Sequence, residues 1–123
     1  MKPLLLGYQR IRITAPDEEI ARARAALVTF SYREGFALAE IFAEADESRP
    51  YYALCALIDA CRRIDVAAVV VPTLSDLGMN AVAQVELRQR LQRETGVPVL
   101  VVEGRGRQRT GGASLVPETE EIN

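Results

Sequence analysis

The chain has no histidine and no tryptophan, one lysine (Lys2) and only two cysteines among its 123 residues. The absence of histidine excludes imidazole-based catalytic triads and the common zinc sites that use histidine. Cys55 and Cys61 fall in one predicted helix at a separation of about 9 Å, which is beyond the roughly 7 Å that a disulfide spans. We therefore expect two reduced thiols in the core, no metal site and no cofactor.

The sequence also lacks long apolar runs and a net positive charge. No stretch approaches the roughly 20 consecutive apolar residues of a membrane helix, and the first residues carry neither a longer apolar block nor a small-residue cleavage site. We expect a soluble, cytoplasmic protein with no membrane contact. The net charge of −2 gives no general attraction to phosphates, so the sequence supports DNA binding only weakly.

What is present fits one compact domain, with 49% hydrophobic and 26% charged residues. Apolar residues follow helical spacing in three segments and form strand-like runs in four. The predicted strands are residues 4–13, 36–43, 66–71 and 97–102; the predicted helices run from about residue 16 to Gly35, over 51–63 and over 80–94; residues 44–50 are a predicted charged loop. The β-branched run at 66–71 is typical of a central strand covered on both faces.

Four boundary signals support these helices. Pro16 and the acidic residues 17–19 suit the start of the first helix, and Gly35 suits its end. Asn80 is a good N-terminal cap for the third helix, and Gly96 ends it. Strands that alternate with helices imply right-handed crossovers between parallel strands. We therefore predict an α/β fold, a three-layer αβα domain with a mainly parallel four-stranded sheet.

The last part of the chain has a different composition. Residues 104–123 are rich in glycine and arginine, with Arg105, Arg107 and Arg109, and then become acidic. They have little apolar surface to bury. We predict a domain over residues 1–103 and a flexible tail over 104–123, whose arginines are either solvated or in contact with nucleic acid.

Short motifs resemble, in the right order, the catalytic domain of serine recombinases, the resolvase/invertase family. The first is Gly7-Tyr8-Gln9-Arg10-Ile11-Arg12, where the family reads glycine-tyrosine-alanine-arginine-valine-serine. The second is Phe42-Ala43-Glu44 followed by Asp46-Glu47-Ser48-Arg49-Pro50. The third is Leu74-Ser75-Asp76-Leu77-Gly78-Met79, where the family reads leucine-aspartate-arginine-leucine-glycine-arginine. The resemblance covers nearly the whole predicted domain and implies the resolvase fold.

The resemblance also implies a chemistry and its loss. In that family a serine hydroxyl attacks a DNA phosphodiester and forms a covalent link, while arginines stabilise the charge that grows on phosphorus. The resemblance places Arg12 at the nucleophile position, and a guanidinium stays protonated and cannot attack. It places Asp76 and Met79 where the family has arginines, and Ser75 where it has an aspartate. It therefore implies a degenerate, catalytically inactive member of the family.

Part of the family site persists. Tyr8 and Arg10 match the family, Glu44 stands in for its acid, and Ser48 is a weak candidate for a serine of the loop. The degenerate family site is therefore Tyr8, Arg10, Arg12, Glu44, Ser48, Ser75, Asp76 and Met79.

The two charge changes predict a compensation. Arg12 and Asp76 are predicted at the carboxyl ends of neighbouring strands, where we expect an ion pair, joined by Arg10 and Glu44, that fills the former phosphate site. A separation above about 6 Å without a bridging group contradicts this pair. The alternative is that Tyr8 and Arg10 are ordinary half-buried strand residues and that Arg12 and Asp76 are solvated.

Three functions follow from these residues. The first is a regulatory or scaffolding protein that pairs with itself or with another protein. The second is a domain that binds a small polar or anionic ligand at the strand carboxyl ends, where Arg12, Glu44, Asp76 and Glu103 are predicted; no glycine-rich phosphate loop supports a nucleotide. The third is a protein associated with DNA recombination.

Overall fold

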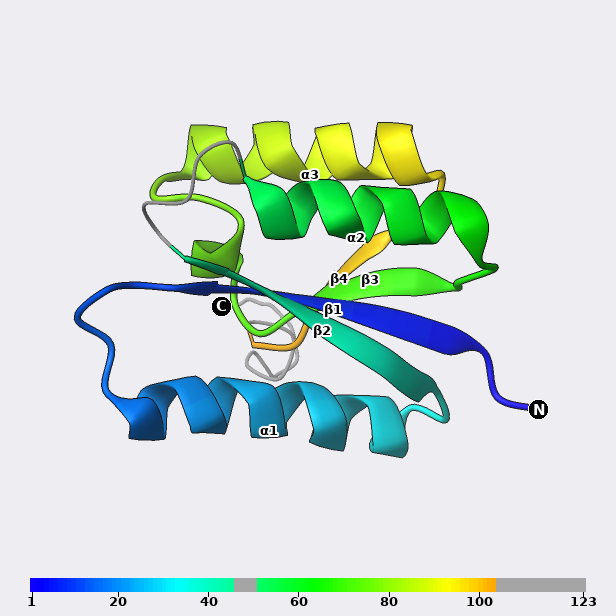
Figure 1. Cartoon of the computed structure of the whole chain (residues 1–123), viewed down its shortest axis with the longest axis horizontal. Helices are drawn as coiled ribbons and strands as arrows, with labels where there is room; N and C mark the ends of the chain where they lie inside the picture. The colour runs from blue at the N-terminus through cyan, green and yellow to red at the C-terminus, as the bar shows by residue number, and fades with distance from the viewer. Residues whose placement is uncertain (46–50, 104–123) are drawn as a thin grey trace, which may run out of the picture.

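The computed structural model describes residues 1–45 and 51–103 (Figure 1). Its elements in chain order are β1 (Leu4–Ile11), α1 (Asp17–Arg33), β2 (Ala37–Ala45), α2 (Tyr52–Arg63), β3 (Ala68–Val71), a 3₁₀ turn η1 (Leu74–Asp76), α3 (Ala81–Thr95) and β4 (Val99–Val101). The predicted alternation of strands and helices is confirmed. Ser48 and the predicted tail 104–123 lie outside the described residues, so the domain boundary stays a prediction.

The sheet has four parallel strands in the order β2-β1-β3-β4. Figure 1 shows α1 on one face of the sheet and α2 with α3 on the other, so the three-layer αβα prediction is confirmed. The chain leaves β1 toward one edge of the sheet and leaves β3 toward the opposite edge. The carboxyl ends of β1 and β3 therefore flank the point where the strand order reverses, which is where open α/β sheets form ligand crevices.

Two apolar clusters hold the layers together. The cluster under α2 and α3 includes Leu6, Tyr8, Leu57, Val69 and Leu91, and the cluster under α1 includes Leu5, Leu27, Ala68 and Val70. The four residues of β3 are all buried, as the β-branched run predicts. Gly7 allows α1 to approach the sheet, because a Cβ atom there would lie 3.1 Å from Cδ1 of Leu27.

The helix signals are confirmed. Pro16 stands at the N-cap of α1 with three acidic residues in the first turn, where the helix dipole favours negative charge. Asn80 caps α3, since its side-chain oxygen accepts a hydrogen bond from the backbone N–H of Ala83 at 2.9 Å. Gly35 and Gly96 follow the helix ends with positive φ angles of 81° and 77°, a conformation that favours glycine.

Three strands are shorter than predicted and one is longer. β1 ends at Ile11 instead of residue 13, because the backbone N–H of Ala15 donates to the carbonyl of Arg12 and turns the chain. β3 and β4 each lose their first two predicted residues, and β4 also loses its last. β2 continues through Ala45, since it pairs with β1 as far as Ile11. The prediction that residues 44 and 45 belong to a loop is therefore wrong.

The two cysteines are reduced as predicted, but only one of them packs against the core. Both are free thiols. Cys61 is partly buried against the core, and this burial raises the pKa of its thiol. Cys55 is exposed, so its predicted place in the core is wrong. Leu54 and Leu57 of α2 are buried. Each residue of a helix is rotated by about 100° from the one before it, so Cys55, which follows Leu54, points outward.

Candidate functional site

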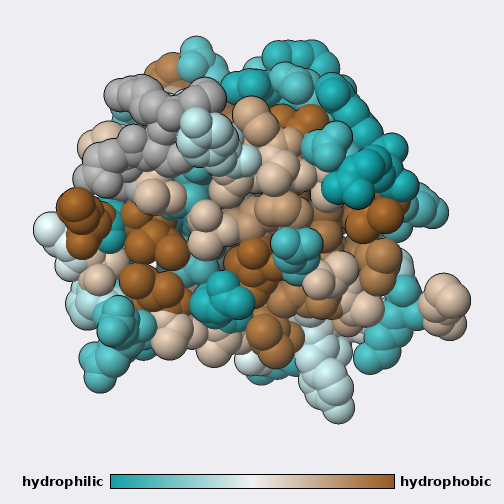
Figure 2. All heavy atoms as spheres, in the orientation of Figure 1, coloured by the Kyte–Doolittle hydropathy of each residue, from teal (hydrophilic) through white to brown (hydrophobic). Residues whose placement is uncertain are grey.

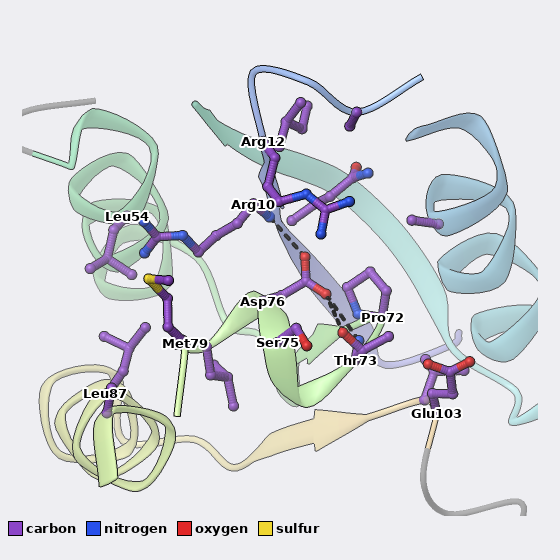
Figure 3. A pocket seen from close by; sticks show the side chains of 18 of the residues that line it. Arg10, Arg12, Leu54, Pro72, Thr73, Ser75, Asp76, Met79, Leu87 and Glu103 are labelled. Atoms are coloured by element: carbon purple, nitrogen blue, oxygen red, sulfur yellow. Dashed lines mark hydrogen bonds between the residues drawn. The ribbon is translucent and has the colours of Figure 1, made fainter. Parts of the chain in front are cut away.

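A cavity of about 1040 Å³ opens at the carboxyl ends of β1 and β3 (Figure 3). Its walls come from the ends of β1, β3 and β4, from the flank of α1 and from the first halves of α2 and α3. Of the residues predicted at the site or at the strand ends, Arg10, Arg12, Ser75, Asp76, Met79 and Glu103 line it. Tyr8 and Glu44 are not among the lining residues, so six of the eight described candidates lie around one cavity.

Asp76 accepts hydrogen bonds from two of the segments that line this cavity. Its side chain is 8% exposed. One carboxylate oxygen accepts the backbone N–H of Arg10 at 2.9 Å, and the other accepts the backbone N–H and the hydroxyl of Thr73, both at 3.0 Å (Figure 3). Burial raises the pKa of Asp76, while these hydrogen bonds act in the opposite direction. Asp76 thus ties the end of β1 to the turn that follows β3.

Glu44 is not among the residues that line the cavity, and its carboxylate contacts the start of α2. It is 1% exposed at the end of β2. Its two carboxylate oxygens accept the backbone N–H groups of Ala53 at 3.2 Å and Leu54 at 2.9 Å, the second and third residues of α2. These are N–H groups that a helix start leaves without partners inside the helix. The prediction that Glu44 joins an ion pair of Arg12 and Asp76 is therefore wrong, because the carboxylate of Glu44 caps a helix.

Tyr8 is fully buried, not half-buried as the simpler alternative assumed. Its hydroxyl donates to Oε1 of Glu44 at 3.4 Å. Burial and, after it, the nearby charge of Glu44 raise the pKa of the phenol. The hydroxyl therefore stays protonated and remains in the core.

The predicted ion pair between Arg12 and Asp76 is wrong. Arg12 lies beyond the end of β1, where its guanidinium donates to Oε2 of Glu19 in α1 at 2.9 Å. Asp76 is occupied by backbone and hydroxyl donors. The guanidinium carbon of Arg10 lies 5.4 Å from the ring centre of Tyr51, and Figure 3 shows this side chain extending toward α2. The turn after Ile11 carries Arg12 toward α1 and leaves Asp76 to the backbone of β1.

The charges of the described residues that line the cavity are balanced. Among residues 1–45 and 51–103, four arginines and four acids line it: Arg10, Arg12, Arg22 and Arg90, and Glu19, Asp76, Glu86 and Glu103. Met79, which the resemblance places at an arginine position, is fully exposed, and the exposed Ser75 adds a hydroxyl. A cavity with equal numbers of both signs gives no general attraction to a phosphate.

Sequence reasoning missed Gln9, which lies in the cavity wall. It is 2% exposed, and its Nε2 donates to the carbonyl of Ile20 at 3.2 Å. Its Oε1 is buried and has no hydrogen-bond partner among the described residues. A polar amide in the middle of a buried strand is the signal that could have identified it, because such a group needs partners.

Gly78 sets the distance between the turn and α3. A Cβ atom at this position would lie 2.8 Å from Cβ of Ala83, closer than real contacts. The glycine therefore permits the close approach that closes this side of the cavity.

Neither a metal cluster nor a membrane helix is found in residues 1–45 and 51–103. No three histidine, cysteine, aspartate or glutamate residues gather there as metal ligands. No helix of this part of the chain has the length and apolar content needed to cross a bilayer.

No protein-family model and no curated protein matches the chain, but solved structures do. The C-terminal catalytic domain of ISC1926 TnpA, an IS607-like serine recombinase, aligns with a TM-score of 0.68 and 17% identity over 84% of this chain and 69% of its own. The N-terminal catalytic domain of TP901-1 integrase aligns with a TM-score of 0.64 and 14% identity over 80% and 76% of the two chains. The chain has the fold of a serine recombinase catalytic domain.

A third structure agrees with this recombinase fold. The C-terminal catalytic domain of IS1535 TnpA, another IS607-like serine recombinase, aligns with a TM-score of 0.60 and 16% identity over 79% and 69% of the two chains. At these identities the similarity establishes the architecture. Chemistry has to be argued from the side chains at the strand ends.

Proposed function

We propose that this recombinase-fold domain does not cut DNA and acts through protein contacts, as a regulatory or scaffolding protein. The observation that carries the proposal is the Arg12–Glu19 ion pair after β1. At the place where the resemblance expects an attacking hydroxyl, the chain presents a permanently protonated guanidinium. Strand transfer needs a nucleophile that can lose a proton.

The rest of the cavity supports the same proposal. Asp76 replaces a cation with an anion, and its oxygens are occupied by Arg10 and Thr73. The hydroxyl of Thr73 donates to Asp76. Among the described residues Ser75 is the serine that lines the cavity, and a nucleophile there would need cations aimed at the phosphate. The four arginines of the described lining are matched by four acids, which does not favour a phosphate.

The test is a plasmid-nicking assay with a parallel gel shift. Supercoiled DNA is incubated with the wild-type chain, with Ser75→Ala and with Arg12→Ser. We expect no nicked product from the wild-type chain or from Ser75→Ala. Nicking by the wild-type chain contradicts the proposal, and loss of that nicking in Ser75→Ala would identify the nucleophile.

A second candidate is the binding of a small polar ligand, and Gln9 favours it. The cavity lies where parallel sheets bind ligands, and the buried Oε1 of Gln9 has no donor in the described part of the chain. Thermal unfolding with small anions, amides and nucleotides tests this function. A ligand present at about 100 times its dissociation constant adds about 2.7 kcal/mol to the free energy of unfolding. No shift with any of them argues against the ligand function.

A role associated with DNA recombination is the third candidate, and the similarity of fold favours it. Such a role without cleavage requires binding to DNA or to a recombinase. The gel shift detects the first, and binding that weakens as salt rises indicates phosphate contacts.

A further inference from the structure

Gln9 places an amide between the centre of the sheet and α1. A Cβ atom at Gly7 would contact Leu27 of α1, so this position of β1 faces α1. Side chains two residues apart on a strand lie on the same face, and Gln9 therefore faces α1 as well. Its Nε2 donates to the carbonyl of Ile20 in α1 at 3.2 Å. Because β1 has β2 on one side and β3 on the other, the amide starts from the middle of the sheet.

The contact with α1 does not explain why an amide is present. The carbonyl of Ile20 lies inside α1, where helical geometry already gives it an N–H partner. The Oε1 atom of Gln9 has no partner among residues 1–45 and 51–103, and the side chain is 2% exposed. A buried acceptor without a donor lowers stability. A leucine of similar size would avoid this cost, so the fold alone does not call for the amide.

One part of the cavity lies beside this amide. We call it the α1 side of the cavity, and the lining residues that define it are Gln9, Ile20, Ala23, Ala26, Pro72 and Val102. Ala23 and Ala26 follow Ile20 at helical spacing, and their small side chains leave room. Val102 packs against the cluster under α1, and Figure 3 shows Pro72 on the side of the strand ends toward α1.

The layer between α1 and the sheet is filled on the β2 side and open at the strand ends. Leu38 and Ile41 of β2 pack against the cluster under α1, and Figure 2 shows apolar residues across the middle of the β2 side. The cavity instead reaches α1 past Pro72 and Val102, which follow β3 and β4. A ligand can therefore approach Gln9 from the carboxyl ends of these strands.

We propose that the α1 side of the cavity binds an uncharged molecule through an amide or lactam N–H group, which donates to Oε1 of Gln9. This inference rests on the ligand-binding function, the second candidate above, and names its ligand class. An amide oxygen can only accept a hydrogen bond, so the ligand has to supply the donor. The cavity of about 1040 Å³ has room for a molecule that is larger than the amide group itself.

The surroundings of Oε1 favour a neutral donor. Apart from Gln9, the residues that define the α1 side are apolar. An ammonium group moved there would lose its hydration and gain only a neutral carbonyl in exchange. A carboxylate or a phosphate would set oxygen against oxygen. The carbonyl of an amide can in turn accept from Arg22, which lines the same cavity.

The test titrates the full chain with γ-butyrolactam, a small neutral lactam, and follows binding by NMR chemical shifts. The N-methyl derivative is the matched probe, because it keeps the ring and the carbonyl but has no N–H. Molecules of this size bind in the millimolar range at best, so the titrations run to about 20 mM. We expect the N-methyl compound to bind at least about tenfold more weakly, since it leaves the buried acceptor without a donor.

Two variants locate the site. Gln9→Leu weakens the binding of γ-butyrolactam at least about tenfold and leaves the free chain as stable as the wild type, whereas loss of a purely structural amide lowers stability. Ala23→Leu fills the α1 side of the cavity and weakens binding in the same way, and it decides the question if Gln9→Leu fails to fold by circular dichroism. Ala25→Leu is the control, because Ala25 is exposed on the same helix and does not line the cavity.

Failure of γ-butyrolactam to bind overturns the inference, and so does equal affinity for the two probes. Binding that survives both Gln9→Leu and Ala23→Leu, or that Ala25→Leu weakens equally, also overturns it. If an anion or a nucleotide raises the thermal stability of the wild type and of Gln9→Leu alike, the ligand function stands and this ligand class is wrong. If no compound binds, both are wrong.

Discussion

The carboxylate of Asp76 accepts the backbone N–H of Arg10 at 2.9 Å and so joins the turn after β3 to the end of β1. Its other oxygen binds Thr73 within the turn. An arginine at this position would have no acceptor to offer these donors. Asp76 therefore has a structural role that an arginine could not fill.

Replacing Asp76 tests this role. Asp76→Asn keeps one acceptor but sets an amide N–H₂ group against the donors of Arg10 or Thr73. We expect the free energy of unfolding to fall by about 1–3 kcal/mol, the cost of leaving buried polar groups unsatisfied. Denaturant unfolding measures it, and the exposed Asp59→Asn is the control, with an expected change within about 0.5 kcal/mol. Equal effects of the two variants would contradict the role.

The carboxyl group of Asp76 should also affect how the free energy of unfolding changes with pH. The folded-state pKa of Asp76 is raised by burial. Its contribution is therefore fully present below the ordinary aspartate pKa and is lost as pH rises through the raised value. The wild-type chain should gain stability relative to Asp76→Asn as pH falls through this window. Unfolding curves of both chains at matched pH values test this. A difference in unfolding free energy that does not change with pH would show that folding does not raise the pKa of Asp76.

Glu44 gives a second pair of matched variants on one strand. Glu44→Gln replaces an acceptor oxygen by a donor at the start of α2, where Ala53 and Leu54 donate. We expect a loss of about 1–3 kcal/mol in the free energy of unfolding. Glu40→Gln, on the exposed side of β2, should change it by less than about 0.5 kcal/mol. If the two variants are equally stable, Glu44 is not a cap.

The burial of the Tyr8 phenol predicts that the folded chain loses stability at alkaline pH. Its folded-state pKa is raised by burial, so its contribution is present below the ordinary tyrosine pKa and is lost as pH rises above it. Tyr8→Phe should flatten the alkaline fall in stability and cost about 1 kcal/mol for the lost hydrogen bond to Glu44. Tyrosinate absorbance followed through alkaline unfolding is the measurement. A Tyr8 that ionises while the chain is still folded contradicts its burial.

The sequence predicts the elements well because their signals are local. The β-branched run at β3, the Asn80 cap and the glycines after α1 and α3 each depend on neighbouring residues. The position of Asp76 in the cavity was also predicted, since strand ends of a parallel sheet meet at one edge.

The partners of the site residues could not be predicted, because they depend on contacts between distant segments. The strand order sets β2 beside β1, which lengthens β2 and brings Glu44 to α2. The short turn after Ile11 sends Arg12 to Glu19. Charge complementarity alone suggested a pair between Arg12 and Asp76 but could not include the backbone donors that compete for Asp76.

We expect this recombinase-fold domain to form no covalent bond to DNA. End-labelled duplex DNA is incubated with the full chain, and the products are separated under denaturing conditions that remove bound but unlinked protein. We expect all label to migrate as free, uncut DNA. Label that stays attached to the chain, with Ser75 or any other serine as the linked residue, would contradict it.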